Sequence, residues 1–376
     1  MKHSSARRYL EFGALCLLAV AIIWWFGRKL DWNEVRAAVK QANWIVLGAA
    51  VLVISSAYLF RAWRWGALLA PLSRSRTADL FAATTVGFSA VFLVGRAGEV
   101  VRPVVLPMRD PRIRPSASFV TILVERIYDT MAVVLLFAAN LLWFKPPGNT
   151  SVDLSRVRLV GVALLVLAVA GVIGFAWFRR RSKVAIDAWV RLVGNRSFMP
   201  ARVNRAVISL LEQLARALRV LTDARELAVT VGWTILVWFG ISFGNLLVLR
   251  AFGLPFGMKE TLFVLGWSLV GSLVPTPGGA AGAFHAATAA GLLVLGVPRE
   301  KAAAVSIVMH LVDFGPAIIF GFFYFLRGDI NISRLRSLTS PEAVEHAVED
   351  EPIADDKSED DGRAPVAKIE KGYVGS

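Results

Sequence analysis

The chain has 376 residues, of which 56% are hydrophobic, and its mean hydropathy is +0.57. A soluble domain could not keep that much apolar surface from water, so the composition excludes a soluble protein and predicts an all-α, polytopic membrane helix bundle. The net charge of +14 suits anionic phospholipid surfaces; no soluble basic domain with interleaved aromatic residues supports a nucleic-acid partner. The one cysteine, Cys16, excludes intramolecular disulfides and cysteine-rich metal sites.

The N-terminal segment predicts a first span that is not cleaved. Basic residues precede an apolar run from Leu10 to Gly27, and no small-residue cleavage site follows Trp24 and Trp25. Further apolar stretches, each near the length that a helix needs to cross or enter a bilayer, lie at 44–70, 80–94, 117–144, 157–178, 226–249, 261–275, 283–297 and 303–326.

Two of these stretches, 80–94 and 261–275, are short and end in sequence rich in glycine or proline. If every stretch crossed, the arginine-dense segment 179–225 would lie outside the cell. If instead 80–107 and 261–297 enter from opposite faces and return, about six helices cross, and 26 lysines and arginines lie on the cytoplasmic side against 11 outside. We therefore predict two re-entrant helical hairpins and cytoplasmic termini. The alternative is two ordinary short spans with an accidental charge bias.

The cytoplasmic segments differ in character. Residues 179–225 carry leucines at helical spacing between arginines, which predicts a basic amphipathic helix lying in the membrane interface or docked on the bundle. Residues 342–361 carry ten acids and one lysine, the composition of a disordered tail. We expect a membrane domain over 1–340 and an acidic, disordered tail over 341–376.

Charged residues also fall inside the predicted spans. The run VERIYDTM places Glu125 and Asp129 one turn apart on one helix face, with Arg126 able to pair with Asp129. Glu125 lies about 14 Å into its span at 1.5 Å per residue. Ionisable groups at that depth are costly, so each is a functional candidate. The alternative is a self-neutralised ion pair that fixes helix packing.

Arginines accompany both the first hairpin and the helix before it. In VGRAGEVVRP, Arg96, Glu99 and Arg102 would sit at the hairpin bend, facing water or one another. Arg61 and Arg64, in YLFRAWRWGALL, either extend to the interface or form a clamp for phosphate oxygens.

The second half of the chain repeats a pattern of the first. Gly95-x-x-Gly98 precedes Arg126-x-x-Asp129, and Gly279-x-x-Gly282 precedes His310-x-x-Asp313, with 28 positions from second glycine to basic residue in both. Together with hairpins of opposed orientation, this indicates a diverged inverted repeat, which many transporters arrange around a midplane site. His285 and His310 either couple proton movement to transport or hydrogen-bond between helices.

Four motifs carry a family resemblance: FRAWRWGALL at 60–69, VGRAGEVVRP at 94–103, VERIYD at 124–129 and PTPGG at 275–279. Together they resemble the transmembrane, flippase-like domain of bacterial lysylphosphatidylglycerol synthases, a family that also occurs as stand-alone membrane proteins. Nothing after Leu326 predicts an aminoacyl-transferase domain, so we expect a stand-alone member.

The resemblance implies a multi-pass protein of the bacterial cytoplasmic (inner) membrane that moves phospholipid headgroups between leaflets. Our candidate substrate-binding residues are Arg61, Arg64, Arg96, Glu99, Arg102, Glu125, Arg126, Asp129, Pro275, Pro277, Gly278, Gly279, His285, His310 and Asp313.

A lipid flippase or lipid-binding transporter for anionic or modified phospholipids is the leading hypothesis. The alternatives are an integral-membrane transferase acting on a lipid-linked substrate and a non-transporting partner of a cell-envelope glycosyltransferase. The sequence has no His/Glu zinc pattern and no GxxxxGK phosphate loop, so we expect no catalytic residue, metal or cofactor. The expected partners are phospholipid headgroups and, in the third hypothesis, a membrane enzyme.

Overall fold

A computed structural model describes residues 2–70, 73–113, 115–144, 155–193, 208 and 224–327. Those residues form helices and no strand, which confirms the all-α class. The acidic tail at 341–376 lies outside the described residues, as does most of the basic segment after Val193.

The helices follow one another with short connections. In chain order they are α1 (Lys2–Gly27), α2 (Trp32–Gln41), α3 (Trp44–Leu69), α4 (Thr77–Val94), the 3-10 helix η1 (Gly95–Val100), α5 (Val101–Arg109), α6 (Pro115–Trp143), α7 (Ser155–Val193), α9 (Ala224–Ala251), α10 (Met258–Gly271), α11 (Pro277–Val294) and α12 (Arg299–Leu326). Asp31 and Asn43 cap the first turns of α2 and α3 through their side-chain oxygens. The first part of the basic segment belongs to α7, which kinks at Arg181.

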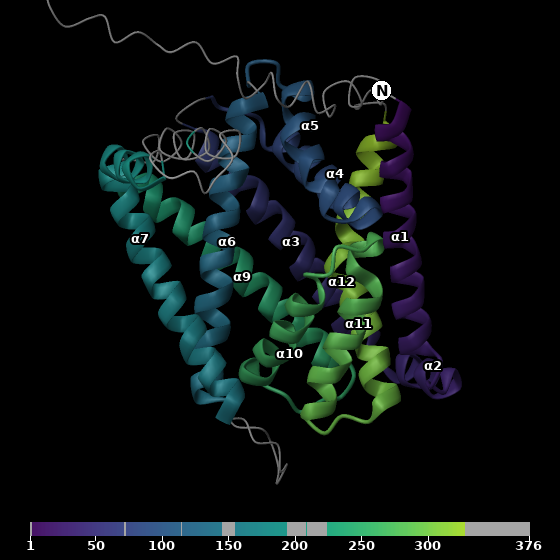
Figure 1. Cartoon of the computed structure of the whole chain (residues 1–376). Helices are drawn as coiled ribbons and strands as arrows, with labels where there is room; N and C mark the ends of the chain where they lie inside the picture. Colours follow the sequence, from purple (N-terminus) through teal and green to yellow (C-terminus); the bar gives the residue numbers. More distant parts are fainter. Residues whose placement is uncertain are drawn as a thin grey trace, which may run out of the picture.

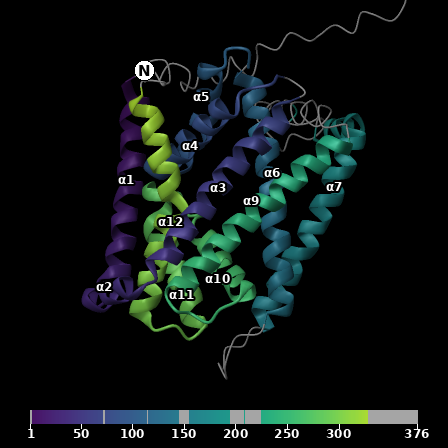
Figure 2. The same cartoon turned by 180° about the vertical axis from the view of Figure 1, so that it is seen from behind.

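Full-length helices run between two ends of the bundle, which we name the upper end, where the N-terminus lies in Figure 1, and the lower end, where α2 lies. Chain direction alternates through α1, α3, α6, α7, α9 and α12, as the six expected crossings require (Figures 1 and 2). By length and composition, α3, α4, α9 and α12 are each apolar enough to cross a membrane. The chain belongs in a bilayer as a multi-pass protein.

The outer surface of the bundle is apolar and its interior carries the charges. Large hydrophobic side chains are exposed along several full-length helices; examples are Leu17, Ile173, Ile235 and Ile319. Arg64 and Glu125, in contrast, have no exposed surface. That is the inside-out distribution expected where hydrocarbon surrounds a bundle and polar groups face its interior.

The first predicted hairpin is present. The α4 helix begins at the upper end and stops inside the bundle, η1 turns the chain, and α5 returns to the upper end (Figure 1). Gly95 opens the bend with φ of +68°, and a Cβ at Gly98 would overlap the backbone of Ala90. Glycine is needed at both positions, for the left-handed backbone and for close approach. Although α4 is long enough to cross, it reverses instead.

The second hairpin enters from the lower end. Helix α10 rises to Gly271 and α11 returns to the lower end (Figures 1 and 2). A Cβ at Gly271 would lie 2.5 Å from the carbonyl oxygen of Ala283, so glycine brings the two arms together. The left-handed turn at Gly278, Gly279 and Ala280 follows Pro277. The hairpins therefore have opposite orientations, as predicted.

The two bends meet inside the bundle. The position of a Cβ on Gly95 lies 3.3 Å from the backbone oxygen of Thr276, which joins the tip of one hairpin to the tip of the other. Helix α4 packs along α12, and α10 packs against α6. Each hairpin thus contacts the long helix that follows the other hairpin: α12 follows the second hairpin and α6 follows the first.

The order of elements is the same in both halves and their direction is opposite. Helix α3, the upper hairpin and α6 make the first half; α9, the lower hairpin and α12 make the second (Figure 1). Helices α3 and α9 pack against each other over a long interface. The predicted inverted repeat is therefore visible in the fold, with α1, α2 and α7 outside it.

Candidate functional site

An arginine and an aspartate from opposite sides of the first half form a buried, bidentate ion pair. Arg64 on α3 donates from Nη1 to Asp129 Oδ1 at 2.6 Å and from Nη2 to Oδ2 at 3.0 Å. The side chain of Arg64 is fully buried and that of Asp129 is 10% exposed. Helix α9 completes the site, because Trp238 donates to Asp129 at 3.2 Å and Thr234 accepts from Arg64 at 3.3 Å. Paired geometry of this kind gives the strongest carboxylate contacts in proteins.

Glu125, one turn earlier on α6, is the centre of the charges. It is fully buried and accepts two hydrogen bonds from Arg102 on α5, at 2.5 and 3.0 Å. Arg126 approaches it at 3.0 Å and Arg64 at 3.2 Å. Three guanidinium groups therefore converge on one carboxylate. The guanidinium of Arg102 also lies over the ring of Trp65, 4.3 Å from its centroid.

The re-entrant hairpin is what brings Arg102 to this place. Arg102 lies at the start of the returning arm, next to α4, and a Cβ on Gly87 of α4 would lie 2.5 Å from the Cβ of Arg102. A glycine at this position lets the two arms approach closely enough for Arg102 to reach Glu125. We call the set Arg64, Arg102, Glu125, Arg126 and Asp129 the charge cluster.

The charge cluster is not neutral, since three arginines face two carboxylates and leave one positive charge in excess. Its members also differ in access. Arg64 and Arg102 are buried, whereas 37% of the Arg126 side chain is exposed. Arg126 reaches Asp129 at 3.6 Å, the pairing expected from the sequence, but its contact with Glu125 is closer. The reachable cation of the cluster is therefore Arg126.

Arg61 lies one turn before Arg64 but has different neighbours. Its guanidinium lies 4.9 Å from the ring centroid of Phe88 and 5.9 Å from that of Tyr58. It has no ion pair with any carboxylate in the part of the chain that the structure describes. Arg61 and Arg64 thus do not share one clamp: Arg64 is bound to carboxylates, and Arg61 is a half-buried cation held by aromatic rings.

The second half repeats the first pairing with an asparagine in place of the arginine. Asn245 on α9 donates to Asp313 on α12 at 3.0 Å, in the place where Arg64 on α3 meets Asp129 on α6. Tyr58 donates to the backbone oxygen of Asp313 at 2.7 Å and so links the halves. The inverted repeat therefore joins its helices through an arginine–aspartate pair in the first half and an asparagine–aspartate pair in the second.

The two histidines lie at the second bend. The Nε2 atom of His310 is 3.2 Å from the backbone oxygen of Gly279, and the rings of His285 and His310 are 4.8 Å apart and perpendicular. Phe284 and Phe314 surround His310. His310 thus makes an interhelical contact of hydrogen-bond length among aromatic rings, whereas the buried Nε2 atom of His285 has no hydrogen-bond partner among the described residues.

The structure brings only part of the predicted set together. The charge cluster unites five candidates, and Arg61 lies beside it. Glu99 is exposed at the first bend, and nothing is described of the Arg96 side chain. Pro275, Pro277, Gly278 and Gly279 form the second bend, where Gly279 contacts His310; Asp313 is paired with Asn245 instead.

Sequence reasoning missed the polar residues of α9 that complete the pairs, Thr234, Trp238 and Asn245. Each lies between apolar neighbours in the sequence, so the polar face of α9 becomes apparent only when residues are compared at helical spacing. The spacing from Thr234 to Trp238, four residues on one helix face, was the available signal.

Two comparisons with known proteins agree with this fold. A protein described as a UPF0104 membrane protein, from Methanothermobacter thermautotrophicus, is 25% identical over 323 residues, which cover 82% of this chain and 90% of that protein. The family model described as the lysylphosphatidylglycerol synthase TM region matches residues 14–321, a range that contains both hairpins and the charge cluster. The chain therefore belongs to the family of lysylphosphatidylglycerol synthase transmembrane regions.

Proposed function

We propose that this protein binds the headgroup of an anionic or modified phospholipid between its two hairpins and moves it from one leaflet to the other. The observation that carries the proposal is the charge cluster with its positive excess, held inside an apolar bundle where two hairpins from opposite ends meet. Family membership supports a lipid-related role in the membrane.

We assign the arginines two different roles, because they differ in burial and in their partners. Arg64 and Arg102 are buried and bonded to carboxylates, so we assign them the task of fixing Glu125 and Asp129. Arg126 is partly exposed, and Arg61 makes no ion pair with a carboxylate of the described residues. We therefore assign binding of the lipid phosphate to these two arginines. Guanidinium offers paired donors to phosphate oxygens and is less strongly hydrated than ammonium, which suits a site shielded from bulk water.

Glu125 and Asp129 would then compensate the buried arginine charges when no lipid is bound. A buried arginine without a partner is expensive, and two carboxylates reduce that cost while leaving one positive charge for the phosphate. The acyl chains would remain in the hydrocarbon while the headgroup passes the bends. The carboxylates are poor candidates for general acid or base work, because each accepts hydrogen bonds from arginine.

We also propose an orientation. The upper end of the bundle carries the N-terminus, the Arg74–Arg76 connection and the start of α9, and we place it in the cytoplasm because the basic segments gather there. The membrane would be the bacterial cytoplasmic membrane. A membrane enzyme that supplies or uses the lipid is a proposed partner.

Leaflet exchange in liposomes tests the transport proposal. The purified protein is reconstituted with fluorescent phosphatidylglycerol, and an impermeant reductant reports the fraction that has moved. Arg126→Gln removes an accessible cation while Arg64 and Arg102 remain on Glu125, so the protein should still fold. Loss of one charge-assisted contact, about 1.5–3 kcal/mol, predicts a roughly 10- to 150-fold slower exchange.

The matched control is Lys259→Gln, which removes one exposed positive charge at the lower end of the bundle. The control should exchange lipid at the rate of the unmodified protein. A rate equal to that of protein-free liposomes, for the unmodified chain and across several anionic and aminoacylated headgroups, would refute transport. Unchanged exchange in Arg126→Gln would refute the assignment of the phosphate to Arg126.

A further inference from the structure

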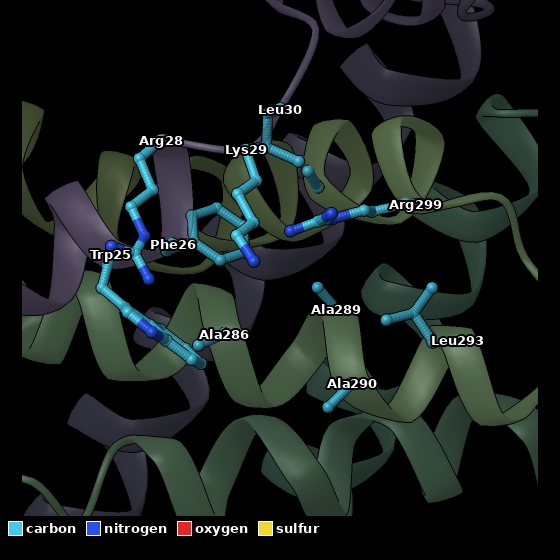
Figure 3. A pocket seen from close by; sticks show the side chains of 11 residues that line it. Trp25, Phe26, Arg28, Lys29, Leu30, Ala286, Ala289, Ala290, Leu293 and Arg299 are labelled. Carbon is cyan, nitrogen blue, oxygen red and sulfur yellow. The ribbon is translucent and has the colours of Figure 1, made fainter.

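A second site lies at the lower end of the bundle, away from the charge cluster. A cavity of about 260 Å³ opens between the end of α1, α11 and the start of α12. Three cations line it: Arg28 and Lys29 follow α1, and Arg299 begins α12. Figure 3 shows the three side chains extending over the same space, with alanines of α11 on the facing wall.

Among the residues that the structure describes, Arg28, Lys29 and Arg299 make no ion pair with a carboxylate. Arg28 is held by the ring of Trp24, at 5.0 Å from its centroid. Three unpaired positive charges that converge on one cavity predict an anionic ligand.

The rest of the lining is apolar. Trp25, Ala289 and Leu293 belong to it, and 59% of Trp25 and 47% of Leu293 are exposed. The cavity is smaller than pockets that enclose a whole drug-sized ligand, roughly 300–1,000 Å³. It therefore suits a phosphate with its glycerol, from which a chain can leave over Trp25 and Leu293 into the surrounding lipid.

The depth of the cavity agrees with a headgroup. Four tryptophans with more than half of their surface exposed lie at the same end of the bundle, at the end of α1 and the starts of α2 and α3: Trp24, Trp25, Trp32 and Trp44. Exposed tryptophan in a membrane protein marks the interface between headgroups and hydrocarbon. The three cations and the apolar wall thus meet at the level of the membrane where phospholipid headgroups join their acyl chains.

We propose that this cavity is a binding site for an anionic phospholipid of the leaflet at the lower end, with its phosphate between Arg28, Lys29 and Arg299 and one acyl chain against Leu293. Binding there does not require transport, so the site stands whether or not the protein moves lipid. The binding experiment uses the full chain.

The test is photocrosslinking in liposomes with phosphatidylglycerol that carries a diazirine in the acyl chain near the glycerol. Peptides of α1 and α11 should carry the label. The triple variant Arg28→Gln/Lys29→Gln/Arg299→Gln should lower labelling roughly 100-fold, since each cation near an anionic headgroup strengthens binding about fivefold. The matched control Arg36→Gln/Lys40→Gln/Lys259→Gln removes three exposed cations outside the cavity and should label like the unmodified protein.

Two further arms identify the ligand. Diazirine-labelled phosphatidylcholine should label the cavity much less, because its choline is repelled by the three cations. Excess inorganic phosphate should not displace phosphatidylglycerol, since it lacks the chain that fills the apolar wall. Equal loss in both triple variants, equal labelling by both lipids, or displacement by phosphate would each overturn the proposal.

Discussion

Replacing Glu125 by glutamine should destabilise the protein strongly. The glutamate is fully buried and receives Arg102 at 2.5 and 3.0 Å, Arg126 at 3.0 Å and Arg64 at 3.2 Å. Glutamine keeps the size but not the charge, and its amide NH₂ group would face guanidinium donors. The excess charge of the cluster rises from one to two around a carboxyl position that is fully buried. Removing one partner of a buried ion pair costs about 3–5 kcal/mol, and we expect a loss of that size.

A double-mutant cycle shows whether the loss of stability comes from buried arginine charge that has lost its partner. Adding Arg102→Gln to Glu125→Gln brings the excess back to one, so part of the stability should return. Coupling between groups in direct contact is about 0.5–3 kcal/mol, and a pair with two hydrogen bonds belongs near the upper value. The assay is unfolding in mixed micelles titrated with sodium dodecyl sulfate, followed by tryptophan fluorescence. Losses that simply add, or a Glu125→Gln loss below about 1 kcal/mol, the size of an exposed pair, would refute the reasoning.

Three further predictions concern the first bend, the loop after α5 and the Asn245–Asp313 pair. Gly98→Ala places a methyl group against the α4 backbone and should lower stability in the same assay by about 1–3 kcal/mol. Unchanged stability would contradict the close approach of Gly98 to Ala90 at the first bend. Hydrogen bonds from Arg112 hold the pKa of the Asp110 carboxyl well below its usual range, so its stabilisation is complete at neutral pH and decreases only as pH falls from about 4 toward the lowered pKa. Asp110→Asn should therefore unfold earlier than wild type at pH 7, and by a smaller margin at pH 3. Asn245→Leu leaves Asp313 without its side-chain donor and should cost about 1–3 kcal/mol, whereas an unchanged midpoint would mean that this pair is dispensable.

The fold was largely predictable because bilayer physics leaves few solutions. Glycine and proline at the ends of two short apolar runs, together with the charge count, were enough to predict re-entrant hairpins entering from opposite faces. Helical spacing also predicted that Glu125 and Asp129 share one face of α6. Both inferences use local sequence or a global rule, and neither needs a tertiary contact.

The partners of these carboxylates could not be predicted in the same way. Arg102 lies 23 residues from Glu125, and Arg64 lies 65 residues from Asp129, so only the folded hairpin and the α3–α6 packing bring them together. Arg61 and Arg64 have different neighbours because Phe88 of α4 lies beside Arg61, and no local pattern predicts that tertiary contact. The cavity at Arg28 and Arg299 joins two loops that are far apart in the chain.

The central claim is that each hairpin begins and ends on the same face of the membrane, and the two hairpins on opposite faces. In a Cys16→Ser background, single cysteines are placed at the ends of the first hairpin, at Arg76 and Pro111, and of the second, at Lys259 and Pro298, all exposed positions. An impermeant maleimide is then applied to sealed vesicles of each orientation. The account predicts that the first two positions are labelled from one face only and the last two from the other face only. Labelling of Arg76 and Pro111 from different faces, or of Lys259 and Pro298 from different faces, would contradict it.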